Sequence, residues 1–421
     1  MISAKESQLA RDSLWVLAAR LGAQGALALF TILIARRLGS AGFGEYAFIA
    51  SAVFIGNMLT TFGTDMLLIR EIAARRDFAQ LIPSLFLQLS LSAVLIALVW
   101  VLPTLPGQSA SGWLALKIYS LALIPFAFFT IFSSVLRGLQ RMDHYTALNL
   151  YTSLVQLAAT FAFIRAGSSV VTLAWLLLAV QIVAAVLAGW LCRDQFPNFR
   201  QPVQFSLRQF RPVLPLAALS ILGILYQRLG ILLVTFWLGA VATGWFSAAL
   251  RVVEFAKTAH LAVFTVLYPA MANSQGGLKE FRAVWLLLLT GALTAAPGIS
   301  LLASPLILVL FGAEYAVSIP LLRLLAWMLI PFTVSTYLTL AFVAANRETP
   351  VLITLTASLL TLILLNLLWT PRFGILGAGW AMLLAECLQA GMLLVQHPKK
   401  SPVVTTSPAP PAGEGAVVHG D

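Results

Sequence analysis

The sequence predicts an all-helical integral membrane protein with about twelve transmembrane helices. Of its 421 residues, 60% are hydrophobic and only 10% are charged, and the mean hydropathy is +0.93. A soluble domain carries about a quarter charged residues, so this chain has too little polar surface to cover its core in water. Backbone in lipid must satisfy its own hydrogen bonds, which leaves helices or a closed barrel. The apolar runs are about 20 residues long, which is the length of a membrane-spanning helix rather than of a barrel strand.

The predicted spans follow one another along the chain and are joined by short loops. The first, at 13–35, is too long for a signal-peptide core and is interpreted as a retained helix. The least regular is 244–270, because it contains Arg251, Glu254 and Lys257. The twelve predicted spans are 13–35, 45–67, 80–102, 114–136, 146–165, 171–192, 212–238, 244–270, 282–303, 320–344, 350–370 and 375–395.

Basic residues in the loops predict the orientation. With the N-terminus in the cytoplasm, the cytoplasmic segments hold sixteen Lys and Arg residues. The opposite side holds five, which are Arg36, Arg37, Lys117, Arg165 and Arg372. This asymmetry satisfies the positive-inside rule. Removing one span would invert every later loop, so we expect an even number of spans near twelve, with both termini cytoplasmic.

The longest loop, 193–211, divides the chain near its midpoint. It predicts a six-helix lobe over 1–192, a second over 212–396, and a tail over 397–421 that is disordered because it is rich in Pro, Ser, Thr and Gly. The pattern LG then GEYA at 38–47 recurs 200 residues later as LG then GWFS at 238–247. The two stretches are either ordinary interfacial turns or equivalent points of two parallel halves. Parallel halves with a site between them are a transporter architecture.

Several classes of protein are disfavoured. The cysteines Cys192 and Cys387 and the four histidines are scattered, which predicts neither a disulfide framework nor a metal site. The sequence contains no GxxxxGK[ST] motif for ATP hydrolysis. A formal net charge of +11 would suggest a nucleic-acid partner for a soluble protein. In a membrane protein the distribution of the charged residues matters more than their sum, so no nucleic-acid partner is expected. No cofactor is predicted.

Polar side chains inside the spans mark a candidate site. A base at a helix centre costs about 2.5–3.5 kcal/mol, so such residues usually line a polar path. On the first span, Ser13, Arg20, Gln24 and Thr31 fall within about 40° at 100° per residue. This stripe is either a helix–helix seam, which the flanking leucines fit, or a cavity wall, which an arginine without an acid favours. We favour the cavity.

The eighth span is the most polar. Ser247, Arg251, Glu254, Lys257 and Thr258 lie within an arc of about 120°. Arg251–Glu254 and Glu254–Lys257 are i,i+3 neighbours that can pair within the helix, which is an alternative structural role for these charges.

The spans hold more bases than acids, and a cationic interior suits an anion such as phosphate. Arg228 is predicted about two-thirds of the way across the seventh span, with Thr235 on the same face, and Arg323 is close enough to its helix end to snorkel. The candidate substrate-binding residues are Arg20, Gln24, Arg228, Arg251 and Lys257, and Glu254 and Glu386 are candidates for coupling or charge balance. No catalytic residue is predicted.

Five stretches together resemble one family. They are LGSAGFGEYAF (38–48), FGTDMLLIREIA (62–73), LGAVATGWFSAALRVVE (238–254), FGAEY (311–315) and FGILGAGWAMLLAE (373–386). Their order and placement are similar to those of the bacterial polysaccharide flippases of the multidrug/oligosaccharidyl-lipid/polysaccharide exporter superfamily. The likeness covers nearly the whole chain except the tail.

The resemblance implies two pseudo-symmetric six-helix lobes around a central cavity, a MATE-like fold in the cell inner membrane. It also implies that oligosaccharide linked to undecaprenyl diphosphate is moved by alternating access, with the polymerase and glycosyltransferases of the pathway as partners alongside membrane lipids. Family members often carry an acid followed by a base near the middle of the seventh helix, whereas this chain has Gln227-Arg228. The alternatives are a multidrug-type exporter, disfavoured by the shortage of buried carboxylates, and a polymerase or ligase, disfavoured by the absence of a substantial outer loop.

Overall fold

The computed structural model describes residues 4–104, 109–195, 214–273, 279–345 and 347–396, and all its regular elements in these ranges are helical. In chain order they are α1 (Ala4–Thr61), α2 (Thr64–Arg75), α3 (Leu81–Val101), α4 (Ala110–Ser120), α5 (Leu123–Gly138), α6 (Met142–Phe163), α7 (Val170–Leu191), α8 (Leu214–Asn273), α9 (Lys279–Leu301), α10 (Ala303–Leu310), η3 (Ala313–Ser318), α11 (Ile319–Leu325), η4 (Ala326–Met328), α12 (Leu329–Ala344) and α13 (Glu348–Gln396).

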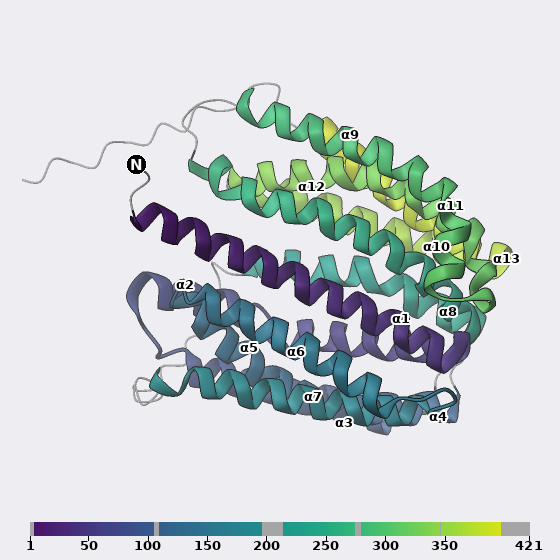
Figure 1. Ribbon diagram of the computed structural model, residues 1–421, viewed down its shortest axis with the longest axis horizontal. Coiled ribbons are helices and arrows are strands. Elements are labelled where there is room, and N and C mark those ends of the chain that lie inside the picture. The colour runs from purple at the N-terminus through teal and green to yellow at the C-terminus, as the bar shows by residue number, and fades with distance from the viewer. Residues whose placement is uncertain (1–3, 105–108, 196–213, 274–278, 346, 397–421) are drawn as a thin grey trace, which may run out of the picture.

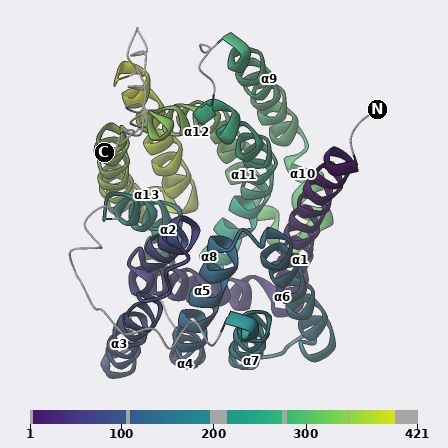
Figure 2. The ribbon, with the colours of Figure 1, turned by 90° about the vertical axis from the view of Figure 1, so that its left-hand side faces the viewer.

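The helices form two lobes that lie side by side with their axes roughly parallel (Figures 1 and 2). The N-lobe comprises α1 to α7, and the C-lobe comprises α8 to α13. Most of the contact between the lobes is made by α1 and α8, the first and longest helices of each. The predicted tail 397–421 and most of the predicted inter-lobe loop 193–211 lie outside the described residues.

Three long helices are each interrupted at one glycine. Gly39 in α1 and Gly239 in α8 adopt nearly the same backbone conformation, with φ of 70° and 77° and ψ of −177° and −176°. Gly374 interrupts α13 with φ of 61°. A positive φ is readily accessible only to glycine. The interruptions fall between the predicted spans 13–35 and 45–67, 212–238 and 244–270, and 350–370 and 375–395, so each long helix contains two spans.

Other spans follow the prediction less closely. The helix predicted at 45–67 ends at Thr61, because Phe62 and Gly63 have positive φ, and α2 follows as a separate helix. The span predicted at 114–136 is divided into α4 and α5. Ser109 begins α4 by accepting a hydrogen bond from the N–H of Gly112, as an N-cap does.

The C-lobe has two broken spans. α9, predicted as 282–303, turns through 68° into α10, and the span predicted at 320–344 comprises α11, η4 and α12. Within the described residues, seven helices are long and apolar enough to cross a membrane, or eight with the bent pair. Each of the three long helices counts as two spans when it is divided at its glycine, and α6, with 22 residues, adds one more. The resulting number of spans is consistent with twelve.

The two glycine breaks meet at one end of the bundle, which we call the hinge end. A Cβ on Gly44 would lie 1.8 Å from the carbonyl oxygen of Ala240, and a Cβ on Gly244 would lie 2.0 Å from that of Ser40. These reciprocal contacts repeat at the offset of 200 residues seen in the sequence. The two stretches are therefore equivalent points of two halves, in contact backbone to backbone, rather than unrelated turns.

Candidate functional site

Glu254 is the centre of an ion cluster on α8. Its Oε2 lies 2.8 Å from Nη1 of Arg251, and its Oε1 lies 3.5 Å from Nη1 of Arg228. Arg251 and Glu254 are i,i+3 neighbours, as predicted, whereas Arg228 reaches them from the other side of the Gly239 break. The three side chains are between 15% and 25% exposed, so water screens these charges little. One carboxylate thus serves two guanidinium groups.

Glu386 of α13 forms a second cluster with Lys257. Nζ of Lys257 lies 3.5 Å from Oε2 of Glu386, whose side chain is only 4% exposed. The hydroxyl of Tyr226 donates to Oε2 at 3.2 Å, and that of Ser335 donates to Oε1 at 3.3 Å. Lys257 therefore pairs with Glu386 across the lobe, whereas the sequence had also allowed it to pair with Glu254.

Aromatic rings surround both clusters. The guanidinium of Arg228 lies 5.5 Å from the ring centroid of Phe54 in the N-lobe, and Nζ of Lys257 lies 4.4 Å from that of Phe332. Tyr46 of the N-lobe is buried. Cation–π contacts of this kind stabilise a base with little water around it. The first cluster thus lies where the two lobes meet.

The position of the first cluster suits a site within the membrane. Arg228 and Arg251 lie on opposite sides of Gly239 in one chain segment. At 1.5 Å per residue both are roughly 16–18 Å from the hinge, about the middle of a hydrocarbon core of about 30 Å. The two clusters hold three bases and two acids. The buried Nε of Arg228 has no hydrogen-bond partner, so the site has both excess charge and a spare donor.

Arg20 and Gln24 are not part of either cluster. Both are exposed, and among the described residues neither has a partner in a hydrogen bond or ion pair. Arg20 precedes the hinge by 19 residues, which places it about 28 Å away, well beyond the depth of Arg228. Thr31, on the same predicted stripe, is buried and donates to the carbonyl of Leu27. The side chain of Ser13 lies outside the described residues.

Two other predicted positions have structural roles. Thr235 is buried, donates to the carbonyl of Ile231 and accepts from Thr243 at 2.9 Å. Arg323 lies at the surface, 3.5 Å from the hydroxyl of Ser304, which is consistent with snorkelling. Among the described residues, no three His, Cys, Asp or Glu side chains come together as a metal site would require.

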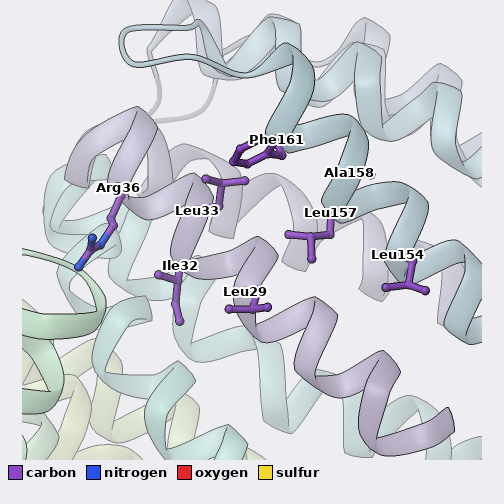
Figure 3. A pocket seen from close by; sticks show the side chains of 8 residues that line it. All are labelled: Leu29, Ile32, Leu33, Arg36, Leu154, Leu157, Ala158 and Phe161. Carbon is purple, nitrogen blue, oxygen red and sulfur yellow. The ribbon is translucent and has the colours of Figure 1, made fainter.

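An open groove of about 620 Å³ lies elsewhere, between α1 and α6. Figure 3 shows that its labelled lining is apolar except for Arg36, which points away from it toward the C-lobe. The apolar side chains are Leu29, Ile32, Leu33, Leu154, Leu157, Ala158 and Phe161. The groove suits hydrocarbon and offers no free charged group to a phosphate.

Comparison with known proteins places the chain in a family. The family model described as polysaccharide biosynthesis protein matches residues 9–275, which cover nearly all of the N-lobe and all of α8. The chain belongs to this family. The resemblance inferred from the five sequence stretches is thereby confirmed. No curated protein matches the chain by sequence.

Solved structures share the fold of this family member. A multidrug resistance MATE family transporter of the MOP superfamily, in an inward-facing conformation, has 15% identity and a TM-score of 0.74, covering 88% of this chain and 92% of its own. The lipid II flippase MurJ, in an inward closed conformation, has 14% identity and a TM-score of 0.72, covering 91% and 87%. A MOP superfamily transporter from Pyrococcus furiosus has 16% identity and a TM-score of 0.66, covering 92% and 94%.

These likenesses confirm the predicted fold class, a helical membrane protein with two pseudo-symmetric lobes. This chain is a multi-pass membrane protein.

Proposed function

We propose that this protein moves oligosaccharide linked to undecaprenyl diphosphate from the cytoplasmic to the outer leaflet of the inner membrane. The lobes would rock against each other, so that the space between them opens first at one end and then at the other. The protein acts as a transporter and not as an enzyme. Both termini lie in the cytoplasm, as the distribution of loop bases predicts.

The observation that supports this substrate class is the sharing of Glu254 by Arg228 and Arg251. A guanidinium has five N–H donors in a planar fork that matches phosphate oxygens. One carboxylate uses few of these ten donors, and Nε of Arg228 is already buried without an acceptor. A diphosphate supplies several acceptors and at least two negative charges, so it satisfies the donors that Glu254 leaves free.

The prenyl chain and the sugars of the substrate would occupy different environments. The prenyl chain remains in lipid, because it gains nothing from a polar site. The sugars occupy the space between the lobes. Arg20 and Gln24, exposed and farther from the hinge, would meet the diphosphate at an earlier stage of its path than Arg228 does. Lys257 adds to the positive potential but is held by Glu386.

The test is to replace Arg228, Arg251 and Arg20 singly with alanine in a strain that depends on this chain for its surface polysaccharide. A charge-assisted hydrogen bond contributes about 1.5–3 kcal/mol, so the Arg228 and Arg251 variants should lose roughly tenfold or more of the output at equal protein level in the membrane. Arg323→Ala, which removes a base from the surface, is the matched control. Normal polymer in all three variants would refute the site.

A multidrug-type exporter remains the second candidate, because MATE transporters share the fold. The net positive charge of the two clusters repels cationic drugs. Resistance to such drugs on overexpression, with unchanged surface polysaccharide on deletion, would favour that function instead.

A further inference from the structure

A second set of contacts joins the lobes at the hinge end, far along α1 and α8 from the ion clusters. Glu314 lies in η3 of the C-lobe and is exposed. Its Oε1 accepts hydrogen bonds from the backbone N–H of Ser40 at 2.8 Å and from the Ser40 hydroxyl at 2.5 Å. Its carboxylate also packs over Gly39, where a Cβ would lie 3.3 Å from Oε2.

The contact with Ser40 has a definite electrostatic origin. Gly39 interrupts α1, so Ser40 begins the second half of that helix. The first N–H groups of a helix have no carbonyl of a preceding turn to bind, and they form the positive end of its dipole. Glu314 therefore caps a helix of the N-lobe from the C-lobe.

Arg36 makes the complementary contact in the opposite direction. Its Nε donates to the carbonyl of Leu310 at 2.9 Å, and its Nη2 donates to that of Val309. These are the last carbonyls of α10, the negative end of that helix. A base of the N-lobe thus caps a helix of the C-lobe, in the direction in which Arg36 points in Figure 3.

Aromatic side chains fill the space beside these charged contacts. The ring of Phe43 in the N-lobe lies 6.3 Å from that of Phe311 and 6.2 Å from that of Tyr315 in the C-lobe. The hydroxyl of buried Tyr315 donates to the carbonyl of Ala35 at 2.9 Å. Trp245 holds η3 to its own lobe through a hydrogen bond from Nε1 to the Glu314 carbonyl. The hinge end is closed by both apolar and charged contacts.

The charged contacts are not copies produced by the repeat. At the offset of 200 residues, Arg36 and Ser40 correspond to Phe236 and Ala240, which have no polar side-chain group. Only the N-lobe hinge offers these two partners to the opposite lobe. None of the ion pairs among the described residues joins the two lobes, so the lobes are connected there by the hydrogen bonds of these two caps and, near the ion cluster, by the cation–π contact of Arg228 with Phe54.

We propose that Glu314 and Arg36 form a two-part latch that sets how readily the lobes separate at the hinge end. The inference rests on the proposed function only in assuming that the lobes separate. Both side chains are exposed, so water replaces each partner when the latch opens. Such exposed charge–dipole contacts modestly stabilise the state in which the lobes meet at the hinge end. When they break, no buried charge is left without a partner. Loss of either half shifts the conformational equilibrium toward separation.

The experiment measures the distance between spin labels in the two lobes at the hinge end of the purified full chain. Labels are attached to L114C in the N-lobe and R372C in the C-lobe, both exposed positions, after Cys192→Ala and Cys387→Ser. In Glu314→Gln and in Arg36→Met, the population with a long distance should rise roughly tenfold, which corresponds to about 1.4 kcal/mol. Arg36→Met keeps the apolar stem beside the groove.

Two controls remove a charge at the same end from N-lobe side chains outside the latch. Glu45→Gln alters a carboxylate that accepts from Ser109 within the N-lobe, and Arg165→Ala removes an exposed base. Neither should change the distance distribution. Arg36→Lys keeps the charge near α10 and should stay close to the unaltered protein.

A second measurement needs no latch variant, so it does not depend on how well a variant folds. Raising the salt concentration to about 1 M shortens the screening length to about 3 Å and should raise the separated population of the unaltered labelled protein. Equal distributions in all variants and salt conditions would overturn the latch, as would equal shifts in the controls. No substrate is present, so this result and the polysaccharide result can each fail without the other.

Discussion

Replacing Glu254 with glutamine leaves Arg228 and Arg251 beside each other without an anionic partner. The carboxylate lies 3.5 Å from one guanidinium and 2.8 Å from the other. All three side chains are at most 25% exposed, so little water can replace the lost charge. Glutamine has nearly the same shape and keeps one oxygen acceptor, which isolates the effect of the charge.

The expected loss follows from the cost of an unpaired buried charge. Removing one partner of a buried ion pair destabilises a protein by about 3–5 kcal/mol. Because the amide oxygen of glutamine still accepts a hydrogen bond, we expect about 3 kcal/mol for Glu254→Gln. The matched control is Glu71→Gln, since the partner Arg70 is 48% exposed. Exposed pairs contribute about 0.2–1 kcal/mol.

The assay is the unfolding of the full chain in mixed micelles with increasing SDS, followed by tryptophan fluorescence. The double variant Glu254→Gln with Arg228→Gln should be more stable than Glu254→Gln alone, because it has one unpaired guanidinium fewer. The reasoning is refuted if Glu254→Gln costs no more than Glu71→Gln. It is also refuted if the second substitution adds a further loss instead of restoring stability.

Three further variants test separate parts of the structure. In Gly44→Val, the added Cβ would lie 1.8 Å from the Ala240 carbonyl oxygen, so spin labels at the hinge end should report separated lobes; an unchanged distance would contradict the backbone contact. Lys257→Met leaves the buried Glu386 without a base and should cost about 3 kcal/mol in the same unfolding assay, with partial recovery on adding Glu386→Gln. Arg37→Ala removes a guanidinium that binds the last carbonyls of α6, so hydrogen exchange there should quicken; unchanged protection would argue against that cap.

The helical architecture was predictable from local signals. Apolar runs of membrane length marked the spans, and the glycines at 39, 239 and 374 fell between predicted spans because a helix interruption with positive φ favours glycine. The breaks within 114–136 and 320–344 each had a local signal, because Pro125 and Pro331 lie in the first turns of α5 and α12, where a proline is tolerated. The predicted spans ran through both breaks because they followed hydropathy, which one proline in an apolar run changes little.

The candidate site was predictable only where a local rule applied. The pairing of Arg251 with Glu254 follows from i,i+3 spacing on one helix. The same rule allowed Lys257 to pair with Glu254, but the packing of α13 against α8 brings Glu386 to it instead. Tyr226 and Ser335, which complete that cluster, are isolated polar residues in apolar spans and carry no periodic signal.

The contact made by Glu314 could not be predicted from its own segment. In the sequence, Glu314 stands only within the stretch FGAEY (311–315), which carries the family resemblance. Its role depends on Ser40, which is 274 residues away in sequence. One local signal pointed to the partner contact made by Arg36. Arg36 is one of the few basic residues predicted on the side of the membrane opposite the cytoplasm, where the positive-inside rule expects few bases.

In the proposed alternating cycle, the placement of the charges decides which contacts break. The ion pairs of the buried clusters, Arg228–Glu254–Arg251 and Lys257–Glu386, lie entirely within the C-lobe. Separation of the lobes therefore leaves every one of these pairs intact, and avoids the several kcal/mol that each broken buried pair would cost. The charged side chains that donate or accept hydrogen bonds between the lobes, Glu314 and Arg36, lie at the exposed hinge end, where water can replace a lost partner. In the proposed cycle, the positive site for the diphosphate is therefore kept while the charged hydrogen bonds that break are exposed ones that can re-form.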